Sequence, residues 1–251
     1  MEQQNYQYQN EGVFAQEGSV SKKFFANVFL FMFVALGLST VAAYLFGVNE
    51  GLMSYLISQD PITGKVGMTL FGYVAMFAPL ALVLTMSFAL SKLSYPVLLG
   101  IFIAYSVLTG ISLSFIMISY TSASIVGCFA SAAGIFGIMA VLGYTTDVDL
   151  SKFGPILMVG LVGIVIASLV NMFLRSDTMS YIISFIGVAL FTALTAYDVQ
   201  KIKRIGMGIE ARGDQVLEVE SKKMAIVGAL TLYLDFLNLF LFLLRIFGSR
   251  K

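Results

Sequence analysis

Two acidic residues, Asp198 and Asp235, stand inside long apolar stretches of this sequence. Asp198 belongs to the run FTALTAYDVQKIKR, and Asp235 belongs to GALTLYLDFLNLFLFLLRIFG. An aspartate at the centre of a membrane helix costs about 2.5 to 3.5 kcal/mol on insertion scales, so such a residue normally faces protein or water and has a function. These two carboxyl groups are therefore the first candidates for chemistry.

Two carboxyl groups in contact at low dielectric constant share one proton, because both cannot ionise cheaply. Such a pair titrates in two coupled steps and would sense pH in a chain that has no histidine. When it is ionised, the pair repels itself and attracts a cation. Calcium prefers six to eight oxygen ligands, so we expect Asp198 and Asp235 to bind calcium only transiently, during passage.

Polar neighbours accompany each acid. Thr231, Asp235 and Asn238 follow an i, i+4, i+7 pattern on one helical face, and Thr195 lies three residues before Asp198. This pattern predicts that Thr195, Thr231 and Asn238 line a pore or support the pair. The alternative is a purely structural role, in which one acid is permanently protonated and forms a hydrogen bond between two helices.

The composition excludes several classes of protein. The 251 residues are 59% apolar and 12% charged, with a mean hydropathy of +0.91; soluble domains carry about 25% charged residues. The net charge of +1 gives no field that would recruit nucleic acid. A single cysteine, Cys128, and no histidine exclude an intramolecular disulfide, a Cys/His zinc site and a histidine-based triad. We expect that the protein is not an enzyme and that it holds no cofactor.

The apolar residues fall into seven blocks, each long enough to cross about 30 Å of hydrocarbon as a helix. The blocks cover roughly residues 24–47, 68–91, 97–119, 123–144, 153–174, 180–203 and 224–247. The sequence thus predicts an all-α membrane protein in which residues 21–251 form one seven-helix transmembrane domain. Residues 1–20, rich in Gln, Asn and Tyr, are expected to be a disordered cytoplasmic tail.

The distribution of basic residues predicts the orientation. Positively charged loops stay in the cytoplasm. The amino-terminal segment and the loops after spans two, four and six hold ten Lys and Arg residues, against five on the other side. We therefore expect the amino terminus inside and the carboxyl terminus outside, unless the last segment is re-entrant.

The two acids should lie at similar depths. Asp198 is seven residues before Ile205, about 10 Å, and Asp235 is eleven residues after Met224, about 17 Å. Because spans six and seven are antiparallel, these depths differ by roughly one helical turn. The two carboxyl groups are expected to meet.

Small residues spaced four apart mark places where helices could approach closely. The sequence offers Gly100 with Ala104, Gly110 with Ser114, Gly127 with Ser131, and Ala130 with Gly134. We expect these pairs to serve packing.

Several of these runs together resemble the Bax inhibitor-1 (transmembrane Bax inhibitor motif) family, its bacterial members in particular. They are AYDVQKIKR around Asp198, LDF around Asp235, YSVLTGISLS in span three and Ala78-Pro79-Leu80 in span two. The resemblance implies a seven-helix bundle with the last helix central, in the cell (inner) membrane, acting as a pH-sensitive calcium leak channel. It maps the sensing aspartates onto Asp198 and Asp235. Span two lacks the arginine that works with the pair in some relatives, and residues 201–223 look like a longer, mixed-charge loop.

Other functions remain open. Calcium ions, protons and membrane lipid are the expected partners, whereas a non-transporting regulator would bind a membrane protease or a cell-death protein. A proton-coupled transporter is a further alternative. An intramembrane aspartyl protease is disfavoured, because Leu232-Tyr233-Leu234-Asp235 replaces the Gly-x-Gly-Asp motif and no Pro-Ala-Leu motif follows.

Overall fold

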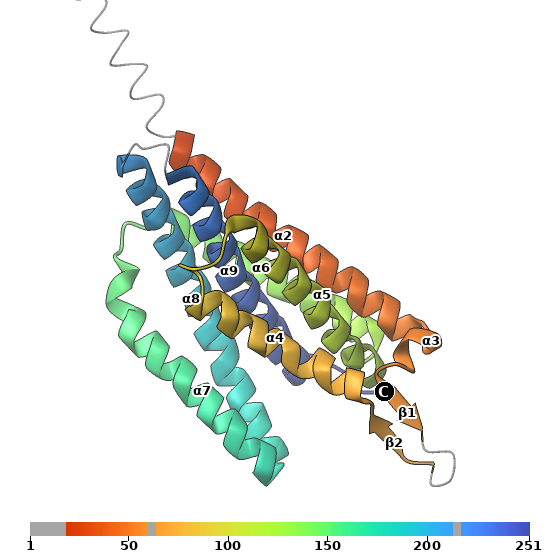
Figure 1. The fold of residues 1–251 in the computed structure, drawn as a ribbon. Helices are drawn as coiled ribbons and strands as arrows, with labels where there is room; N and C mark the ends of the chain where they lie inside the picture. The colour runs from red at the N-terminus through yellow and green to blue at the C-terminus, as the bar shows by residue number, and fades with distance from the viewer. Residues whose placement is uncertain (1–18, 60–63, 213–216) are drawn as a thin grey trace, which may run out of the picture.

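The computed structural model describes residues 19–59, 64–212 and 217–251. Seven of its helices are long and apolar enough to cross a membrane (Figure 1). They are α2 (Ser19–Val48), α4 (Leu70–Phe88), α5 (Tyr95–Ser119), α6 (Ser122–Thr145), α7 (Gly154–Leu174), α8 (Asp177–Arg212) and α9 (Leu217–Phe247). The predicted all-α, seven-helix fold is confirmed. Most of the tail expected over residues 1–20 lies outside the described residues, and α2 already begins at Ser19.

Short elements join these helices. After α2 come the one-turn helix α3 (Glu50–Met53) and a small hairpin of antiparallel strands β1 (Ile57–Gln59) and β2 (Val66–Met68). The 3-10 helix η1 (Leu150–Phe153) leads directly into α7.

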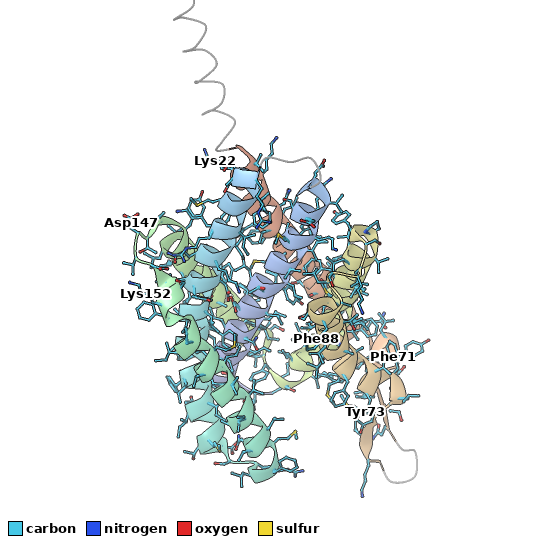
Figure 2. All side chains as sticks on the ribbon, turned by 60° about the vertical axis from the view of Figure 1, so that its left-hand side comes forward. Lys22, Phe71, Tyr73, Phe88, Asp147 and Lys152 are labelled. Carbon is cyan, nitrogen blue, oxygen red and sulfur yellow. The ribbon has the colours of Figure 1, made fainter. Side chains whose placement is uncertain are left out.

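Helix α9 lies in the middle of the bundle. It packs against α2, α5, α6 and α8, and 67% of its most apolar stretch is buried, compared with 11% for the segment that contains α7. Helix α4 packs chiefly on α5, and α7 on α8, so these two helices lie at the periphery (Figure 1). The exposed aromatic residues Phe71, Tyr73 and Phe88 project outward from α4 (Figure 2). The central position of the last helix, implied by the family resemblance, is confirmed.

The charged stretch 201–223 is not the long loop that the sequence suggested. Helix α8 continues to Arg212 and α9 starts at Leu217, so only residues 213–216, which are not described, separate them. Residues 201–212 and 217–223 contain mostly good helix formers, and Lys222 pairs with Glu218 one turn before it at 2.7 Å. Both helices gain about two turns, so the relative depth of Asp198 and Asp235 is unchanged.

Close helix contacts occur at some of the predicted glycines and not at others. A Cβ atom on Gly110 would overlap the backbone of Ser39 on α2, and one on Gly143 would overlap the backbone of Ala196 on α8. Gly100, Gly127 and Gly134 have open space at the same position. Gly110 therefore does what the small-residue pattern predicted, whereas on α6 a close contact with α8 is made by Gly143, outside that pattern.

The start of α2 and the carboxyl terminus lie at opposite ends of the bundle (Figure 1). The backbone N–H of Thr121 donates to the Ser249 carbonyl at 3.0 Å, and that of Lys251 donates to the Ser119 carbonyl at 3.1 Å. These bonds hold the carboxyl terminus where α5 ends and α6 begins. Figure 2 shows Lys22, Asp147 and Lys152 together at the other end. The last helix therefore runs the full length of the bundle and is not re-entrant.

Candidate functional site

The carboxyl groups of Asp198 on α8 and Asp235 on α9 interact directly with each other. Both side chains are buried, with exposed fractions of 8% and 4%. The Oδ2 atom of Asp235 has no hydrogen-bond partner among the described residues, although it is removed from solvent. A buried acceptor without a partner is rare in native proteins and marks either a functional group or a place for an ion or water.

One positive charge acts on this pair. Lys201 lies three residues beyond Asp198 on α8 and is exposed. Its ammonium group interacts electrostatically with the carboxylate of Asp198. Among the described residues, no three acidic, histidine or cysteine side chains gather in a group that could hold a metal ion. A cation at the pair would therefore find two carboxylates and no complete cage.

The three polar residues predicted near the pair bond to their own helices. Thr195 is fully buried and donates to the Phe191 carbonyl at 2.7 Å, one turn before it on α8. Thr231 and Asn238, both half-buried on α9, likewise donate to carbonyls four residues earlier, at 3.1 and 2.9 Å. Their donors are thus satisfied within the helices, and their oxygen atoms remain available as acceptors. Asn238 also lines a cavity at the carboxyl-terminal end of α9.

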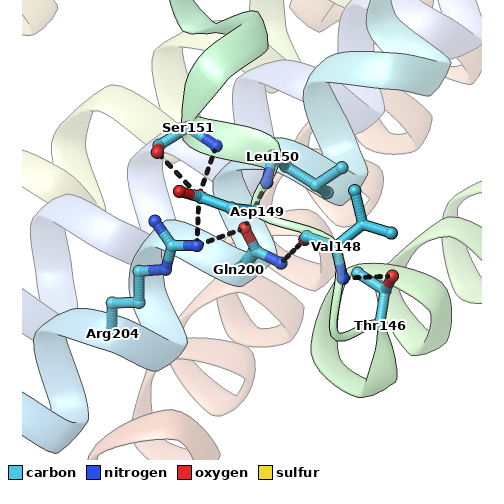
Figure 3. Close-up of polar contacts among 7 residues, drawn as sticks. All are labelled: Thr146, Val148, Asp149, Leu150, Ser151, Gln200 and Arg204. Atoms are coloured by element: carbon cyan, nitrogen blue, oxygen red, sulfur yellow. Dashed lines mark hydrogen bonds and ion pairs between the residues drawn. The ribbon is translucent and has the colours of Figure 1, made fainter.

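A polar clamp, formed by Gln200 and Arg204 of α8, holds the segment between α6 and α7. The Nε2 atom of Gln200 donates to the Val148 carbonyl, and its Oε1 atom accepts from the Leu150 N–H, both at 2.8 Å (Figure 3). Gln200 follows Asp198 by two residues, about 3 Å along the helix axis. Because residues two apart point to nearly opposite sides of a helix, the clamp holds the segment Thr146–Ser151 on the side of α8 away from Asp235.

Arg204 completes the clamp one turn further along α8. Its guanidinium group donates to the carboxylate of Asp149, with which it forms an ion pair, and to Gln200 Oε1 at 2.9 Å (Figure 3). The Ser151 hydroxyl and N–H also donate to Asp149, at 2.7 and 3.0 Å. These hydrogen bonds from Ser151, together with the interaction with Arg204, hold the pKa of Asp149 well below its usual range.

A second polar group lies on the side of α9 that faces α2 and α5. The Tyr233 hydroxyl, fully buried, lies 2.6 Å from Ser39 Oγ, and Ser39 Oγ lies 2.7 Å from the Ser106 carbonyl. Tyr233 can donate to Ser39 while Ser39 donates to the carbonyl. The ring of Tyr105 packs edge-on against Tyr233, with centroids 5.4 Å apart. This group anchors α9 two residues before Asp235.

Sequence reasoning missed the clamp and the tyrosine group. Gln200 belongs to the Tyr-Asp-x-Gln step that carried the family resemblance, which was the one available signal for its importance. Asp149 lies at the end of a predicted span, where acidic residues are common, and Arg204 is one of the ten basic residues counted for the orientation. Their pairing spans 55 residues and has no local pattern.

A central helix whose buried acid faces a second acid on a neighbouring span, in a bundle of seven spans, defines a polytopic membrane protein with an intramembrane carboxyl pair. Comparisons with known proteins place it in a family. The sequence matches, over residues 21–251, the family described as inhibitor of apoptosis-promoting Bax1. The chain therefore belongs to the Bax inhibitor-1 family, as the resemblance suggested.

Bacterial relatives match along almost the whole chain. Inner membrane protein YbhL of Escherichia coli K12 is 45% identical over 228 residues, which are 91% of this chain and 92% of the relative. A protein of Borreliella burgdorferi is 42% identical over 239 residues, covering 94% and 96% of the two chains. Protein RP147 of Rickettsia prowazekii is 38% identical over 230 residues, covering 92% and 91%. None of these names assigns a reaction.

Proposed function

We propose that this protein lets calcium ions leak through the membrane and that the Asp198/Asp235 pair opens and closes the path according to pH. The observation that carries the proposal is the direct contact of two buried carboxyl groups from neighbouring helices. Burial of two acids in contact has a large electrostatic cost unless a proton or a cation lies between them. The pair is thus suited to exchange a bound proton for a cation.

Protonation would close the path. When one carboxyl is protonated, its O–H donates to the other carboxylate and holds α8 against α9. When that proton leaves to water, two negative charges face each other and repel. A calcium ion can then replace the proton, and it leaves again because two carboxylates supply only part of the six to eight oxygen ligands that it prefers.

The surrounding polar groups support passage. Thr195, Thr231 and Asn238 keep free oxygen atoms after bonding to their own helices. In the proposed path these oxygen atoms line the route and replace part of the water shell of the ion. Their hydroxyl and amide donors stay fixed, so a cation meets acceptors and no competing donor.

We further propose that the protein lies in the inner membrane with its amino terminus in the cytoplasm. The relative YbhL is named an inner membrane protein, and the end of the bundle that carries Lys22 and Lys152 is the one richer in basic residues (Figure 2). A reporter enzyme fused after Lys251 should show its activity on the outer side of the membrane and none in the cytoplasm. Cytoplasmic activity of that fusion would contradict the orientation.

Calcium flux in vesicles tests the channel. The purified chain, reconstituted in calcium-loaded vesicles without any partner, should release calcium at a rate that depends on pH. Asp198→Asn and Asp235→Asn should each change that rate and flatten its pH dependence, whereas Asp147→Asn, an exposed acid outside the spans, should leave both unchanged.

Each alternative function predicts a different result in the same vesicles. Absence of any leak would favour a regulator that works through a partner protein. Saturable calcium uptake driven by a pH gradient would favour a proton-coupled transporter. An unchanged pH dependence in both single variants would remove the sensing role of the pair.

A further inference from the structure

A cavity of about 570 Å³ lies between the ends of α7 and α9 and the beginning of α8. It is at the end of the bundle that holds the carboxyl terminus, opposite the polar clamp. Three arginines line it, Arg175 after α7, Arg245 in α9 and Arg250 in the tail, against one acid, Asp177. The lining therefore has two excess positive charges, and its volume is in the range of small-molecule sites, about 300–1,000 Å³.

These arginines have no acidic partner of their own. Within residues 19–59, 64–212 and 217–251, none of the three guanidinium groups forms an ion pair. Arg245 lies over the ring of Phe242, 5.8 Å from its centroid, and its charged group remains free to bind an anion. Guanidinium groups bind phosphate in a bidentate manner, which makes arginine the preferred residue for such groups.

Arg175 is held at the cavity in an unfavourable backbone conformation. Arg175 ends α7 in the left-handed region, with φ of 53°, and it is the one described non-glycine residue with a positive φ. Asn171 holds this turn, since its carbonyl accepts from the Arg175 N–H at 2.7 Å and its side chain donates to Ser180 at 2.7 Å. Glycine would fit this conformation without strain, so the side chain of Arg175 has a use there.

We infer that this cavity binds the phosphate of an anionic phospholipid headgroup. The cavity opens beside membrane-spanning helices, and its lining includes apolar side chains of Met172, Leu241 and Phe242. Phe173 and Leu174, at the end of α7, are 81% and 64% exposed and offer an apolar surface for the acyl chains. A free phosphate ion would use the arginines alone, whereas a lipid would use both parts of this surface.

A lipid bound in this cavity would also affect a cation that enters from this end of the bundle. Asn238 lines its inner part and lies one turn beyond Asp235 on α9. Three unpaired arginines would repel a cation that entered here, and the phosphodiester of a bound lipid, with its one negative charge, would offset part of this repulsion. The lipid site itself stands independently of the proposed calcium passage, because binding is measured without calcium.

Lipid binding to the delipidated full chain in detergent tests the inference. We expect phosphatidylglycerol to remain bound through size-exclusion chromatography and to raise the Tm, and we expect phosphatidylcholine to do neither. An arginine near an anionic lipid contributes about fivefold in affinity, so R175Q/R245Q/R250Q should lose most of the bound phosphatidylglycerol. The matched variant K23Q/K92Q/R212Q removes three exposed positive charges elsewhere and should retain it.

Three results would overturn the inference. They are equal retention of phosphatidylglycerol by the two triple variants, equal binding of phosphatidylcholine, and displacement of phosphatidylglycerol by millimolar inorganic phosphate, which would identify a soluble anion as the ligand. If R175Q/R245Q/R250Q does not fold, the single variant R250Q, changed at an exposed residue of the tail, should still bind about fivefold more weakly. Unchanged affinity of R250Q would then count against the site.

Discussion

Arg204 on α8 forms an ion pair with Asp149, which lies 55 residues earlier in the chain, just before η1. With Gln200, this pair fixes the α6–η1 connection to the turn of α8 that follows Asp198. The connection and α8 must therefore move together. Any rotation of α8 that separates the two buried carboxyl groups must either break the polar clamp or move the α6–η1 connection together with α8.

Loss of Asp149 should destabilise the protein in a pH-dependent way. The pKa of Asp149 is lower in the folded protein than in the unfolded chain, where it is about 3.9. Its contribution to stability is therefore complete above about pH 4 and is lost as the pH falls through the lower, folded value. Asp149→Asn should lower the Tm at neutral pH, and the difference from the wild type should shrink in acid.

The control for this prediction lies two residues away. Asp147 is exposed and forms no ion pair among the described residues. Asp147→Asn removes the same charge from the same connection and should leave the Tm unchanged at every pH. An equal loss of Tm in both variants would show that net charge, rather than the clamp, is responsible.

Replacement of both buried acids by asparagine should leave a folded protein. The two amides of D198N/D235N can still form a hydrogen bond, because each has a donor and an acceptor. We expect a Tm close to that of the wild type and a calcium leak that no longer depends on pH, measured in detergent and in vesicles respectively. Failure of this double variant to fold would instead indicate that the acids are structural.

Gly143 should tolerate no side chain. A Cβ atom there would lie 2.8 Å from the Cα atom of Ala196 and closer still to its carbonyl oxygen. Gly143→Ala should therefore cost about 1–3 kcal/mol of stability through overpacking. Gly134→Ala on the same helix meets open space and should be neutral or stabilising by about 0.5–1 kcal/mol, because alanine favours the helix. Equal Tm values for the two variants would contradict this contact.

Removal of the Tyr233 hydroxyl should weaken the anchor of α9. Tyr233→Phe loses the 2.6 Å contact with Ser39 inside the bundle, and a net hydrogen bond contributes about 0.5–1.5 kcal/mol. Tyr44→Phe removes a hydroxyl from a side chain that is 59% exposed and should have no effect. Thermal unfolding of both variants in the same detergent measures the difference.

The sequence was enough to predict the seven spans and the relative depth of the two acids, because hydropathy marks the spans and the rise per residue is fixed. It did not predict the length of α8 and α9, since their charged ends have no apolar signal and are helical through side-chain pairs and packing. The pairing of Arg204 with Asp149 and the gathering of Arg175, Arg245 and Arg250 also escaped prediction. Both depend on segments far apart in the chain that only the folded bundle brings together.

The central position of α9 has a consequence for biosynthesis. This helix is the last of the seven spans to leave the ribosome, so the six earlier spans enter the membrane before the central helix is present. Until then, Ser39 and Asp198 have no partner on α9, and the earlier spans remain exposed to chaperones and membrane proteases. Any chain that stops before residue 217 should therefore be degraded rather than persist as a partly active bundle.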